Sequence, residues 1–351
     1  MPQPAPHRPP PRFCVWELTL ACDARCIHCG SSAGAPRPAE LDTPEALALC
    51  DALADLGVPH VTLSGGEPLL RPDWEQLAAR LVARDVAVEL ISNGLALDDD
   101  VARRIARSGV RSVTLSIDGP EAIHDALRGV RGAFSRAVAA AARLRRQGLP
   151  VGAATQINAR NIDRLEELEL ALCDAGFQGW QLQLTMPHGR CAEHADLVVP
   201  PAAVLRIVDF VLAARARRKL PAYAADNIGW MLRCEPLLRS RKDPPESFYP
   251  GCQAGLGVIG LASDGTVRGC LSLPPAFDEG NVRDRPLAAI WHDESLFAFN
   301  RRFRASDLTG ACAECPFARV CRGGCKSLAV AVTGGASENP YCARLSSSTE
   351  R

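Results

Sequence analysis

The 351-residue sequence lacks three features, each of which would assign it to a class of proteins. Lysine and arginine together number 40, as do aspartate and glutamate, so the formal net charge is zero. This balance gives no sign of a surface that binds nucleic acid or another polyanion. No apolar run is long enough to span a bilayer. Residues 1–12 are rich in proline and lack the apolar centre of a secretion signal, so we expect a disordered arm there.

Cysteine, in contrast, is abundant. The chain has fifteen cysteines and no export signal, which favours a reducing cytoplasm in which thiols bind metals rather than form disulfides. Seven of the fifteen lie in the last hundred residues, which indicates a second metal-rich region. The chain length is sufficient for two domains. We therefore expect a cytoplasmic protein with a metal site in each of two domains.

The first candidate metal site is the segment 22–30, Cys-Asp-Ala-Arg-Cys-Ile-His-Cys-Gly. Cys22, Cys26 and Cys29 follow an apolar strand-type run at C-x3-C-x2-C spacing. Thiolates are the ligands of [4Fe–4S] clusters, and three of them leave one iron open for chemistry. His28 keeps zinc compatible with this loop. Three reduced, buried thiols without a metal are the remaining alternative.

Strand-type apolar segments alternate with amphipathic helical segments from residue 13 to about residue 220. Six such units predict a parallel sheet with right-handed crossovers, and six are fewer than a closed eight-fold barrel needs. We expect an α/β fold, a partial (β/α)6 barrel of the TIM type, with its active site at the carboxyl ends of the strands. The expected strands are 13–20, 60–64, 87–92, 112–117, 150–156 and 179–185, and the expected helices are 43–56, 72–84, 98–108, 132–147, 161–175 and 201–219.

Polar residues follow four of the expected strands. Gly65 and Gly66 permit a close approach of the backbone to a ligand, and Glu67 offers a carboxylate to an ammonium group. Each motif alone is compatible with ordinary turn chemistry, but four at one edge, beside the cysteine loop, favour a binding site. The motifs are Ser64-Gly65-Gly66-Glu67-Pro68, Ser92-Asn93-Gly94, Ser116-Ile117-Asp118-Gly119 and Thr155-Gln156-Ile157-Asn158.

The cysteine loop followed by Gly-Gly-Glu-Pro resembles the radical S-adenosylmethionine superfamily over residues 13–220. The resemblance implies a [4Fe–4S] cluster held by Cys22, Cys26 and Cys29, with an open iron that binds the amino and carboxylate groups of S-adenosylmethionine. It also implies the reaction. One electron cleaves the cosubstrate to methionine and a 5′-deoxyadenosyl radical, which abstracts a hydrogen atom from the substrate.

The same resemblance assigns the contacts to S-adenosylmethionine. His28 replaces the aromatic residue that usually precedes the third cysteine, and we expect its ring near the adenine. Arg128, in the stretch His124-Asp125-x2-Arg128-Gly129, is expected either at the cosubstrate carboxylate or as a solvated residue at a helix end. The methionine end is assigned to Gly65, Gly66 and Glu67, and the ribose or carboxylate to Ser92, Asn93, Ser116 and Asp118.

A second, ordered set of cysteines fills the last third of the chain. Ser263-Asp264-Gly265-Thr266 predicts a hairpin turn that brings Cys270 near Cys252. A zinc module is an alternative for the four cysteines between 312 and 325. However, the seven thiols of the set are one short of two complete four-thiolate sites. The set is Cys252, Cys270, Cys312, Cys315, Cys321, Cys325 and Cys342.

The spacing of this set resembles the SPASM extension of radical S-adenosylmethionine enzymes, which implies two auxiliary [4Fe–4S] clusters and three clusters in all. The first auxiliary cluster then has an open iron or an outlying fourth ligand, for which Cys234 is the first candidate and Cys191 the second. We expect the barrel at 13–220, a linker at 221–245 and a small irregular SPASM domain with a β-hairpin at 246–351. By resemblance, the first cluster takes Cys252, Cys270 and Cys325, and the second takes Cys312, Cys315, Cys321 and Cys342.

The remaining cysteines have simpler interpretations. Cys14, Cys50 and Cys173 lie among apolar residues and are expected to be small core side chains. Cys191 follows the sixth strand, where it is either an inert thiol or a redox or hydrogen-atom donor. His188 and Arg190, on the same loop, are expected to face substrate or solvent.

SPASM-bearing relatives imply, as the first hypothesis, a maturase that forms a thioether or carbon–carbon crosslink in a ribosomally made peptide. The alternatives are formylglycine formation in a sulfatase and radical oxidation of a tetrapyrrole or another small molecule. An iron–sulfur electron carrier or a zinc scaffold is the non-enzymatic alternative, and the Gly-Gly-Glu-Pro rim argues against it.

The expected partners are the precursor peptide or protein and an electron donor such as flavodoxin or ferredoxin. Because only a dozen residues precede the first strand, we expect leader binding to use a separate protein or the SPASM face, or not to occur. Nucleic acid and membrane are not expected partners.

Overall fold

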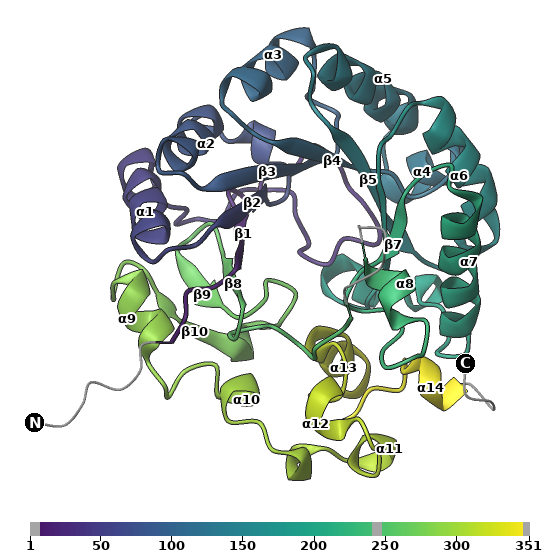
Figure 1. The fold of residues 1–351 in the computed structure, drawn as a ribbon. Helices are drawn as coiled ribbons and strands as arrows, with labels where there is room; N and C mark the ends of the chain where they lie inside the picture. Colours follow the sequence, from purple (N-terminus) through teal and green to yellow (C-terminus); the bar gives the residue numbers. More distant parts are fainter. Residues whose placement is uncertain (1–7, 241–247, 347–351) are drawn as a thin grey trace, which may run out of the picture.

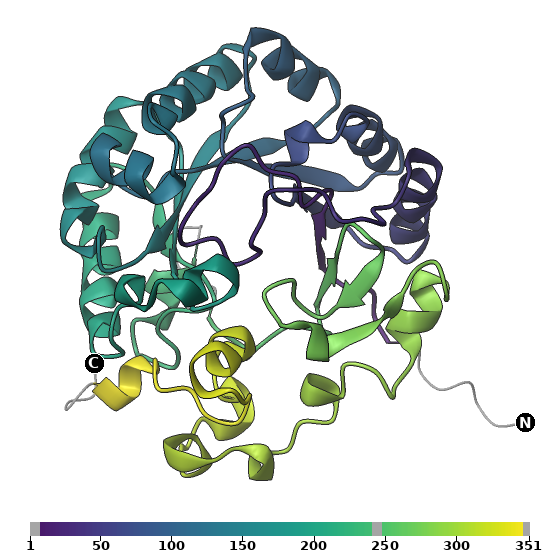
Figure 2. The ribbon, with the colours of Figure 1, turned by 180° about the vertical axis from the view of Figure 1, so that it is seen from behind.

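One continuous sheet organises the molecule (Figure 1). The computed structural model describes residues 8–240 and 248–346. The strands of the sheet follow the order β10-β9-β8-β1-β2-β3-β4-β5-β6-β7, and all neighbouring pairs from β8 to β7 are parallel. The large helices form an arc around the outer side of the curved sheet, and the C-terminal third lies where the arc is open (Figures 1 and 2). The predicted partial barrel is confirmed.

The elements of the barrel lie close to the expected segments. The first helix begins as its sequence predicts, because Asp42 Oδ1 accepts a hydrogen bond from the backbone N of Glu45 at 2.8 Å and Glu45 closes a capping box. The strands are β1 (Phe13–Glu17), β2 (His60–Ser64), β3 (Ala87–Ser92), β4 (Ser112–Ser116), β5 (Val151–Ile157) and β6 (Trp180–Leu184). The helices are α1 (Thr43–Asp55), α2 (Trp74–Ala83), α3 (Asp99–Arg107), α4 (Glu121–Arg128), α5 (Ala133–Arg146), α6 (Leu165–Asp174) and α7 (Ala203–Arg217).

The structure adds two parallel strands to the six that the sequence predicts. β7 (Ala222–Ala224) pairs with β6, and β8 (Val258–Leu261) pairs with β1 at the opposite end of the series. A strand of three residues is too short to show alternation, which explains why β7 was not predicted. Residues 221–240, expected as linker, therefore contribute β7 and α8 (Glu235–Arg239), and residues 241–245 lie outside the described residues.

The predicted hairpin is present in the C-terminal third. β8 and β9 (Thr266–Arg268) are antiparallel neighbours, and β10 (Asp278–Asn281) completes the edge of the sheet. Short helices follow, namely α9 (Leu287–His292), α10 (Ala298–Arg301), α11 (Gly310–Ala313), α12 (Ala318–Cys321), α13 (Lys326–Thr333) and α14 (Ala343–Ser346). Because β8 joins β1, the SPASM region and the barrel share one sheet rather than forming two separate cores.

Residues around the start of β1 strengthen this junction. The backbone N atoms of Arg12 and Phe13 both donate to the carbonyl of Gly257, at 2.8 and 3.1 Å. Trp291 Nε1 donates to the carbonyl of Pro9 at 3.0 Å. Residues 8–12 of the expected arm are therefore bound to the C-terminal third, and residues 1–7 lie outside the described part.

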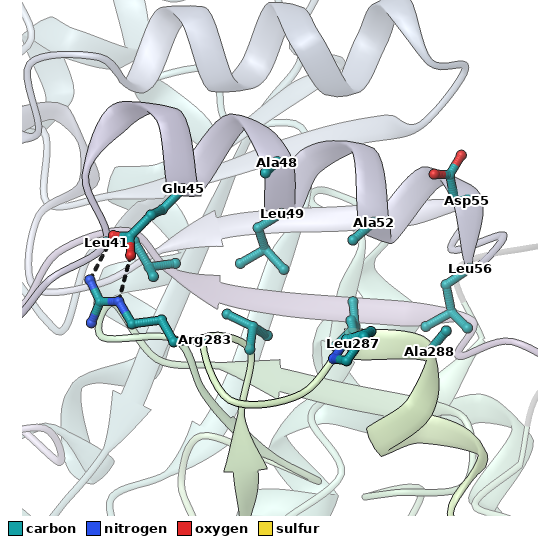
Figure 3. Close-up of a pocket in the computed structure, with 12 residues that line it drawn as sticks. Leu41, Glu45, Ala48, Leu49, Ala52, Asp55, Leu56, Arg283, Leu287 and Ala288 are labelled. Carbon is teal, nitrogen blue, oxygen red and sulfur yellow. Dashed lines mark hydrogen bonds and ion pairs between the residues drawn. The ribbon is translucent and has the colours of Figure 1, made fainter.

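The helix α1 also contacts the C-terminal third directly. Figure 3 shows Arg283 reaching from the segment after β10 to Glu45 on α1, with Arg283 Nε 2.6 Å from Glu45 Oε1. Apolar side chains such as Leu49 and Leu287 line a cleft of about 680 Å³ between these elements. Across the described residues, no helix is both long and apolar enough to cross a membrane.

The two faces of the barrel sheet differ in polarity. In β4, Val113 and Leu115 are fully buried, whereas the alternate residues Thr114 and Ser116 are partly exposed. The same alternation places polar, partly exposed side chains on β6, at Gln181 and Gln183. Closed eight-fold barrels fill their interior with branched apolar side chains. This barrel keeps a polar and accessible inner face, which leaves space for a ligand.

Candidate active site

The three cysteines of the N-terminal loop line one cavity at the carboxyl ends of the strands. The cavity has a volume of about 150 Å³. Most of the residues that the sequence assigns to S-adenosylmethionine line it as well, and Gln156 joins them. Its lining includes Cys22, Cys26, His28, Cys29, Ser64, Gly65, Gly66, Ser92, Asn93, Ser116, Arg128 and Gln156. Glu67 and Asp118 are fully buried beside it and do not line it.

The glycine pair after β2 brings two backbones into contact. Gly66 N donates to the carbonyl of Thr19, and Glu67 N donates to that of Ala21, both at 2.8 Å. A Cβ atom at Gly65 would lie 2.4 Å from the Thr19 oxygen, and one at Gly66 would lie 2.3 Å from the Ala21 oxygen. Only glycine therefore fits here, and the close approach fixes the start of the cysteine loop against β2.

Glu67 organises the ends of β2 and β3. Its carboxylate accepts a hydrogen bond from Ser92 Oγ at 2.9 Å and one from Asn93 N at 2.7 Å. Burial raises the pKa of Glu67 to about 7, although these hydrogen bonds oppose that rise. Because Ser92 and Asn93 already engage the carboxylate, the assignment of Glu67 to the methionine end of the cosubstrate stays a prediction.

Asn93 connects the rim to the cysteine loop. Its Nδ2 donates to Asp23 Oδ1 at 2.7 Å and to Cys22 Sγ at 3.8 Å. A hydrogen bond to a thiolate sulfur both orients the ligand and adjusts its electron density. Asn93 is therefore placed to hold Cys22 in a ligating position.

His28 and Asp118 have a different environment from the one expected. His28 Nε2 lies 3.0 Å from Asp118 Oδ2, with both side chains almost completely buried. Arg128 Nη2 lies 2.6 Å from the same carboxylate oxygen. Arg128, His28 and His124 together hold the pKa of Asp118 well below its usual range, against the effect of burial. The ring of His28 is thus directed to a carboxylate, and its predicted place near an adenine stays a prediction.

The loop between β6 and α7 also contacts the cysteine loop, in addition to the contacts from the ends of β2 and β3. Arg190 Nη1 donates to the carbonyl of Cys26 at 2.7 Å, and its Nη2 donates to that of Ala33 at 2.6 Å. A Cβ atom at Gly189 would lie 2.4 Å from the carbonyl oxygen of Gly30, so this loop packs directly on the cysteine loop. In this structure, Arg190 therefore positions the loop rather than facing substrate or solvent.

His188 extends the same contact to the SPASM region. Its Nε2 lies 3.1 Å from Ser327 Oγ, and Ser327 Oγ donates to the carbonyl of Ser272 at 2.6 Å. Ser327 lies two residues after Cys325, and Ser272 lies two residues after Cys270. One loop thus contacts both the N-terminal cysteine loop and Ser327, which lies two residues after Cys325.

The seven cysteines of the C-terminal third lie near one another in two groups, and their assignment to two clusters stays a prediction. Burial chiefly raises the pKa of Cys325, and the neighbouring thiols Cys252 and Cys270 add to that rise. Among the members of the second set, burial raises the pKa of Cys321 to about 12, with further contributions from the other three. Those three are Cys342, Cys312 and Cys315.

The second set also encloses a space. Cys312, Cys315, Cys321 and Cys342 line a cavity of about 210 Å³. Lys326 is buried close to both sets, and its Nζ donates to the carbonyl of Ala336 at 2.7 Å. Sequence reasoning did not single out Lys326. Its signal in the sequence was its position directly after Cys325, a predicted ligand, where a buried ammonium group would offset the negative charge of thiolates.

Three thiols on one short loop fit the chemistry of an iron–sulfur cluster, whose ligands are cysteine thiolates. Within residues 8–240 and 248–346, no three side chains of the metal-binding types are arranged to hold one ion. The cysteine trio instead lines a cavity together with backbone and hydroxyl groups. Burial raises the pKa of Cys22 to about 11, so thiolate binding by a metal releases protons there.

The other cysteines lie in the hydrophobic core or against it. Cys14 and Cys50 are fully buried, and Cys173 packs against the same core cluster. Cys191 is buried in a small cluster with Leu127 and Leu197. This burial favours the interpretation of Cys191 as an inert thiol.

The chain is similar to known proteins over most of its length. The sequence profile described as the Radical SAM superfamily matches residues 16–171, and the SPASM profile, described as an iron-sulfur cluster-binding domain, matches residues 252–316. The AdoMet-dependent heme synthase of Methanosarcina barkeri is 32% identical over 95% of this chain and 96% of its own length. The mycofactocin maturase MftC of Mycolicibacterium smegmatis is 31% identical over 89% of this chain and 77% of its own.

The fold has solved counterparts. The crystal structure of Streptococcus suis SuiB bound to S-adenosylmethionine superposes with a TM-score of 0.73. The superposition covers 95% of this chain and 76% of SuiB, at 18% sequence identity. At that identity, the likeness concerns the fold alone.

Proposed function

The chain belongs to the radical S-adenosylmethionine superfamily and carries an SPASM domain, and on this premise we propose that it modifies a tetrapyrrole. Membership of the superfamily implies S-adenosylmethionine and a [4Fe–4S] cluster as cofactors, and the SPASM domain implies further iron–sulfur clusters. The proposal adds the substrate, the residues that hold each cofactor and the number of clusters.

Cys22, Cys26 and Cys29 hold the first cluster in this proposal, because they line one cavity and the glycine pair fixes their loop. When bound, that cluster supplies one electron for the reductive cleavage of S-adenosylmethionine. Side chains of the protein position the cosubstrate in this proposal. The hydroxyl of Ser116 and the amide of Gln156 offer hydrogen bonds in the same cavity.

One observation carries the choice of a tetrapyrrole. The heme synthase of Methanosarcina barkeri is 32% identical to this chain, and the match covers 95% of this chain and 96% of the heme synthase. The peptide maturase hypothesis thereby becomes the second candidate. The polar inner face of the barrel, with Gln181 and Gln183, offers hydrogen bonds to carboxylate side chains of a porphyrin.

The second candidate is modification of a ribosomally made peptide. The similarity to the mycofactocin maturase MftC favours it, at 31% identity over 89% of this chain. In this case the substrate enters the same barrel mouth, and the chemistry at the cavity is unchanged. A leader-binding partner and an electron donor such as flavodoxin or ferredoxin belong to this proposal as well.

Product analysis distinguishes the two candidates. The anaerobically reconstituted enzyme, with a reductant and S-adenosylmethionine, is incubated with an iron porphyrin that carries propionate side chains or with a panel of peptides. We expect the porphyrin to raise the amount of 5′-deoxyadenosine formed. We also expect mass spectrometry to show that the porphyrin is converted to a product of lower molecular mass. Stimulation and a mass change only with a peptide would instead support the second candidate. No 5′-deoxyadenosine under any condition would overturn both.

Metal analysis tests the proposed number of clusters. Three [4Fe–4S] clusters predict about twelve irons per chain. Replacement of Cys312 and Cys315 by alanine should lower this by about four, and replacement of Cys22, Cys26 and Cys29 should lower it by about four independently. Unchanged iron in either variant would contradict the corresponding ligand set.

A further inference from the structure

A buried group of charged side chains lies directly behind the cysteine loop, and the chemistry proposed above does not use it. The side chain of Arg128 is 11% exposed, and those of Asp118 and His28 are 0% and 1% exposed. Burying charges is unfavourable unless they are paired and oriented.

Arg128 connects the carboxylate to a cysteine of the loop. Its Nη2 forms the ion pair with Asp118 Oδ2 at 2.6 Å, and its Nη1 donates to Cys26 Sγ at 3.7 Å. A guanidinium group holds its donors in a rigid plane, so fixing one nitrogen also fixes the other. Asp118 thereby aims the second nitrogen of Arg128 at the Cys26 sulfur.

The carboxylate of Asp118 is itself held in place. Gln156 N donates to Asp118 Oδ1 at 3.0 Å, and Asn161 Nδ2 donates to the Asp118 carbonyl at 2.6 Å. Asp118 N donates to His124 Nδ1 at 3.0 Å. These contacts come from β5, from the segment after it and from α4. The orientation of Arg128 is thus built into the barrel.

The cysteine loop is attached to the same helix end. Arg25 N donates to the carbonyl of Arg128 at 3.1 Å, and Ile27 N donates to that of Leu127 at 3.0 Å. These two backbone bonds flank Cys26. The distance between the guanidinium group and the sulfur is therefore set by backbone contacts as well as by side chains.

The expected role of Arg128 at a cosubstrate carboxylate does not account for this geometry. Nη1 already contacts Cys26 and Nη2 already contacts Asp118. The buried Nε has no hydrogen-bond partner among residues 8–240 and 248–346. Each terminal nitrogen carries two N–H groups, so these contacts engage one donor on each and exist independently of any bond to a cosubstrate carboxylate.

We propose that Arg128, oriented by Asp118, is a positioning residue that raises the reduction potential of the cluster on Cys22, Cys26 and Cys29. A hydrogen bond to a cluster sulfur, together with a nearby positive charge, stabilises the reduced and more negative form. The bond to Cys26 thus makes the electron easier to deliver to that cluster. This inference rests on the proposed function, because it requires a cluster on this loop.

A potentiometric titration tests the inference. The reconstituted holoenzyme is poised anaerobically at a series of potentials, and the electron paramagnetic resonance signal that changes on addition of S-adenosylmethionine reports the loop cluster. In Arg128→Met we expect about a tenfold lower ratio of reduced to oxidised cluster at a given potential, which is a shift of about 59 mV for one electron. Arg103→Met, at an exposed arginine of α3, serves as the matched control and should not shift.

Two further variants separate the hydrogen bond from net charge. Asp118→Asn removes a negative charge but keeps a side-chain oxygen that can accept from Arg128 Nη2 and so preserve its orientation, and the potential of this variant should not fall. The double variant Asp118→Asn/Arg128→Met leaves the local net charge unchanged and no unpaired buried carboxylate. It should still show a lower potential, because the bond to Cys26 is lost. If Arg128→Met fails to fold, this double variant carries the test.

The outcomes distinguish the two proposals. A wild-type potential in the double variant would overturn the role of Arg128 and leave the proposed function intact. A wild-type protein without any signal that responds to S-adenosylmethionine would overturn the proposed function, and the role of Arg128 with it.

Discussion

At the scale of single residues, the glycine pair after β2 tolerates no side chain, because the backbone of the cysteine loop lies directly against it. Replacing Gly66 by alanine places a Cβ atom 2.3 Å from the Ala21 carbonyl oxygen, and neither backbone is free to move. We expect Gly66→Ala to destabilise the protein by about 3 kcal/mol or more. It should also prevent iron binding by the cysteine loop, as measured by thermal unfolding and by iron content.

Gly179→Ala is the matched control for this substitution, because a Cβ atom there meets nothing within 4 Å. This variant should keep the stability and iron content of the wild type. Equal behaviour of Gly66→Ala and Gly179→Ala would contradict the close approach between β2 and the cysteine loop.

Glu67 gives a prediction about pH. Burial raises the pKa of Glu67 from 4.5 to about 7, so the folded protein binds more protons than the unfolded chain between these values. The stability contributed by this group is therefore fully present below about pH 4.5 and is lost as the pH rises through about 7. Urea unfolding of the iron-free protein should show this decline.

In Glu67→Gln, the decline should be weaker, because glutamine does not titrate. Glu294→Gln, at an exposed residue of the C-terminal third, should retain the wild-type pH dependence. Identical slopes for wild type and Glu67→Gln would show that the buried carboxyl does not titrate in this range.

Some contacts of single residues could be predicted from the sequence, and others could not. The spacing of Cys22, Cys26 and Cys29 predicted their shared cavity, because three ligands on one short loop are close in any fold. The partners of His28 and Arg128 were not predicted. Their common partner Asp118 lies 90 residues from His28 in sequence, and only the parallel arrangement of the strands brings them together.

At the scale of elements, the loop between β6 and α7 fixes the cysteine loop. Arg190→Met removes two hydrogen bonds, to the carbonyl oxygens of Cys26 and Ala33. We expect a loss of about 2 kcal/mol in unfolding free energy and faster loss of iron from the loop. The release of iron to a chelator, followed over time, measures the second effect.

Arg160→Met is the control for this loop variant, since Arg160 is exposed and pairs only loosely with Asp196 at 3.4 Å. Its iron should be released at the wild-type rate. A normal rate in Arg190→Met would show that the loop contact is dispensable for metal retention.

The helices and strands that were predicted correctly have clear local sequence patterns. β2 was predicted residue for residue, because its alternating pattern is bounded by Pro59 and by the glycine pair. β7 was missed, since three residues carry no periodicity. The pairing of β8 with β1 was also missed. That pairing joins residues about 245 positions apart, and no local pattern encodes it.

At the scale of the whole molecule, this pairing makes the barrel and the SPASM region one folding unit. Glu17 at the end of β1 accepts a hydrogen bond from Ser263 Oγ at 2.9 Å and pairs with Arg37 at 2.8 Å. Trp16 and Trp291, from opposite ends of the chain, belong to one core cluster. The N-terminal cysteine loop and the cysteines of the C-terminal third are thus held at fixed positions relative to one another.

We therefore expect the iron-free full-length protein to unfold in a single thermal transition, with the same midpoint by far-ultraviolet circular dichroism and by tryptophan fluorescence. A truncated chain that ends at residue 240 exposes the edge of β1 and loses the partners of Arg12 and Phe13 at Gly257. It should be insoluble or fail to show a cooperative transition.

Breaking only the exposed pair of Arg283 and Glu45 by Arg283→Met should change the midpoint little, because surface pairs contribute weakly. Two separate transitions in the full-length protein, or a soluble and cooperative truncated chain, would show that β8 is an accessory to an independently stable barrel.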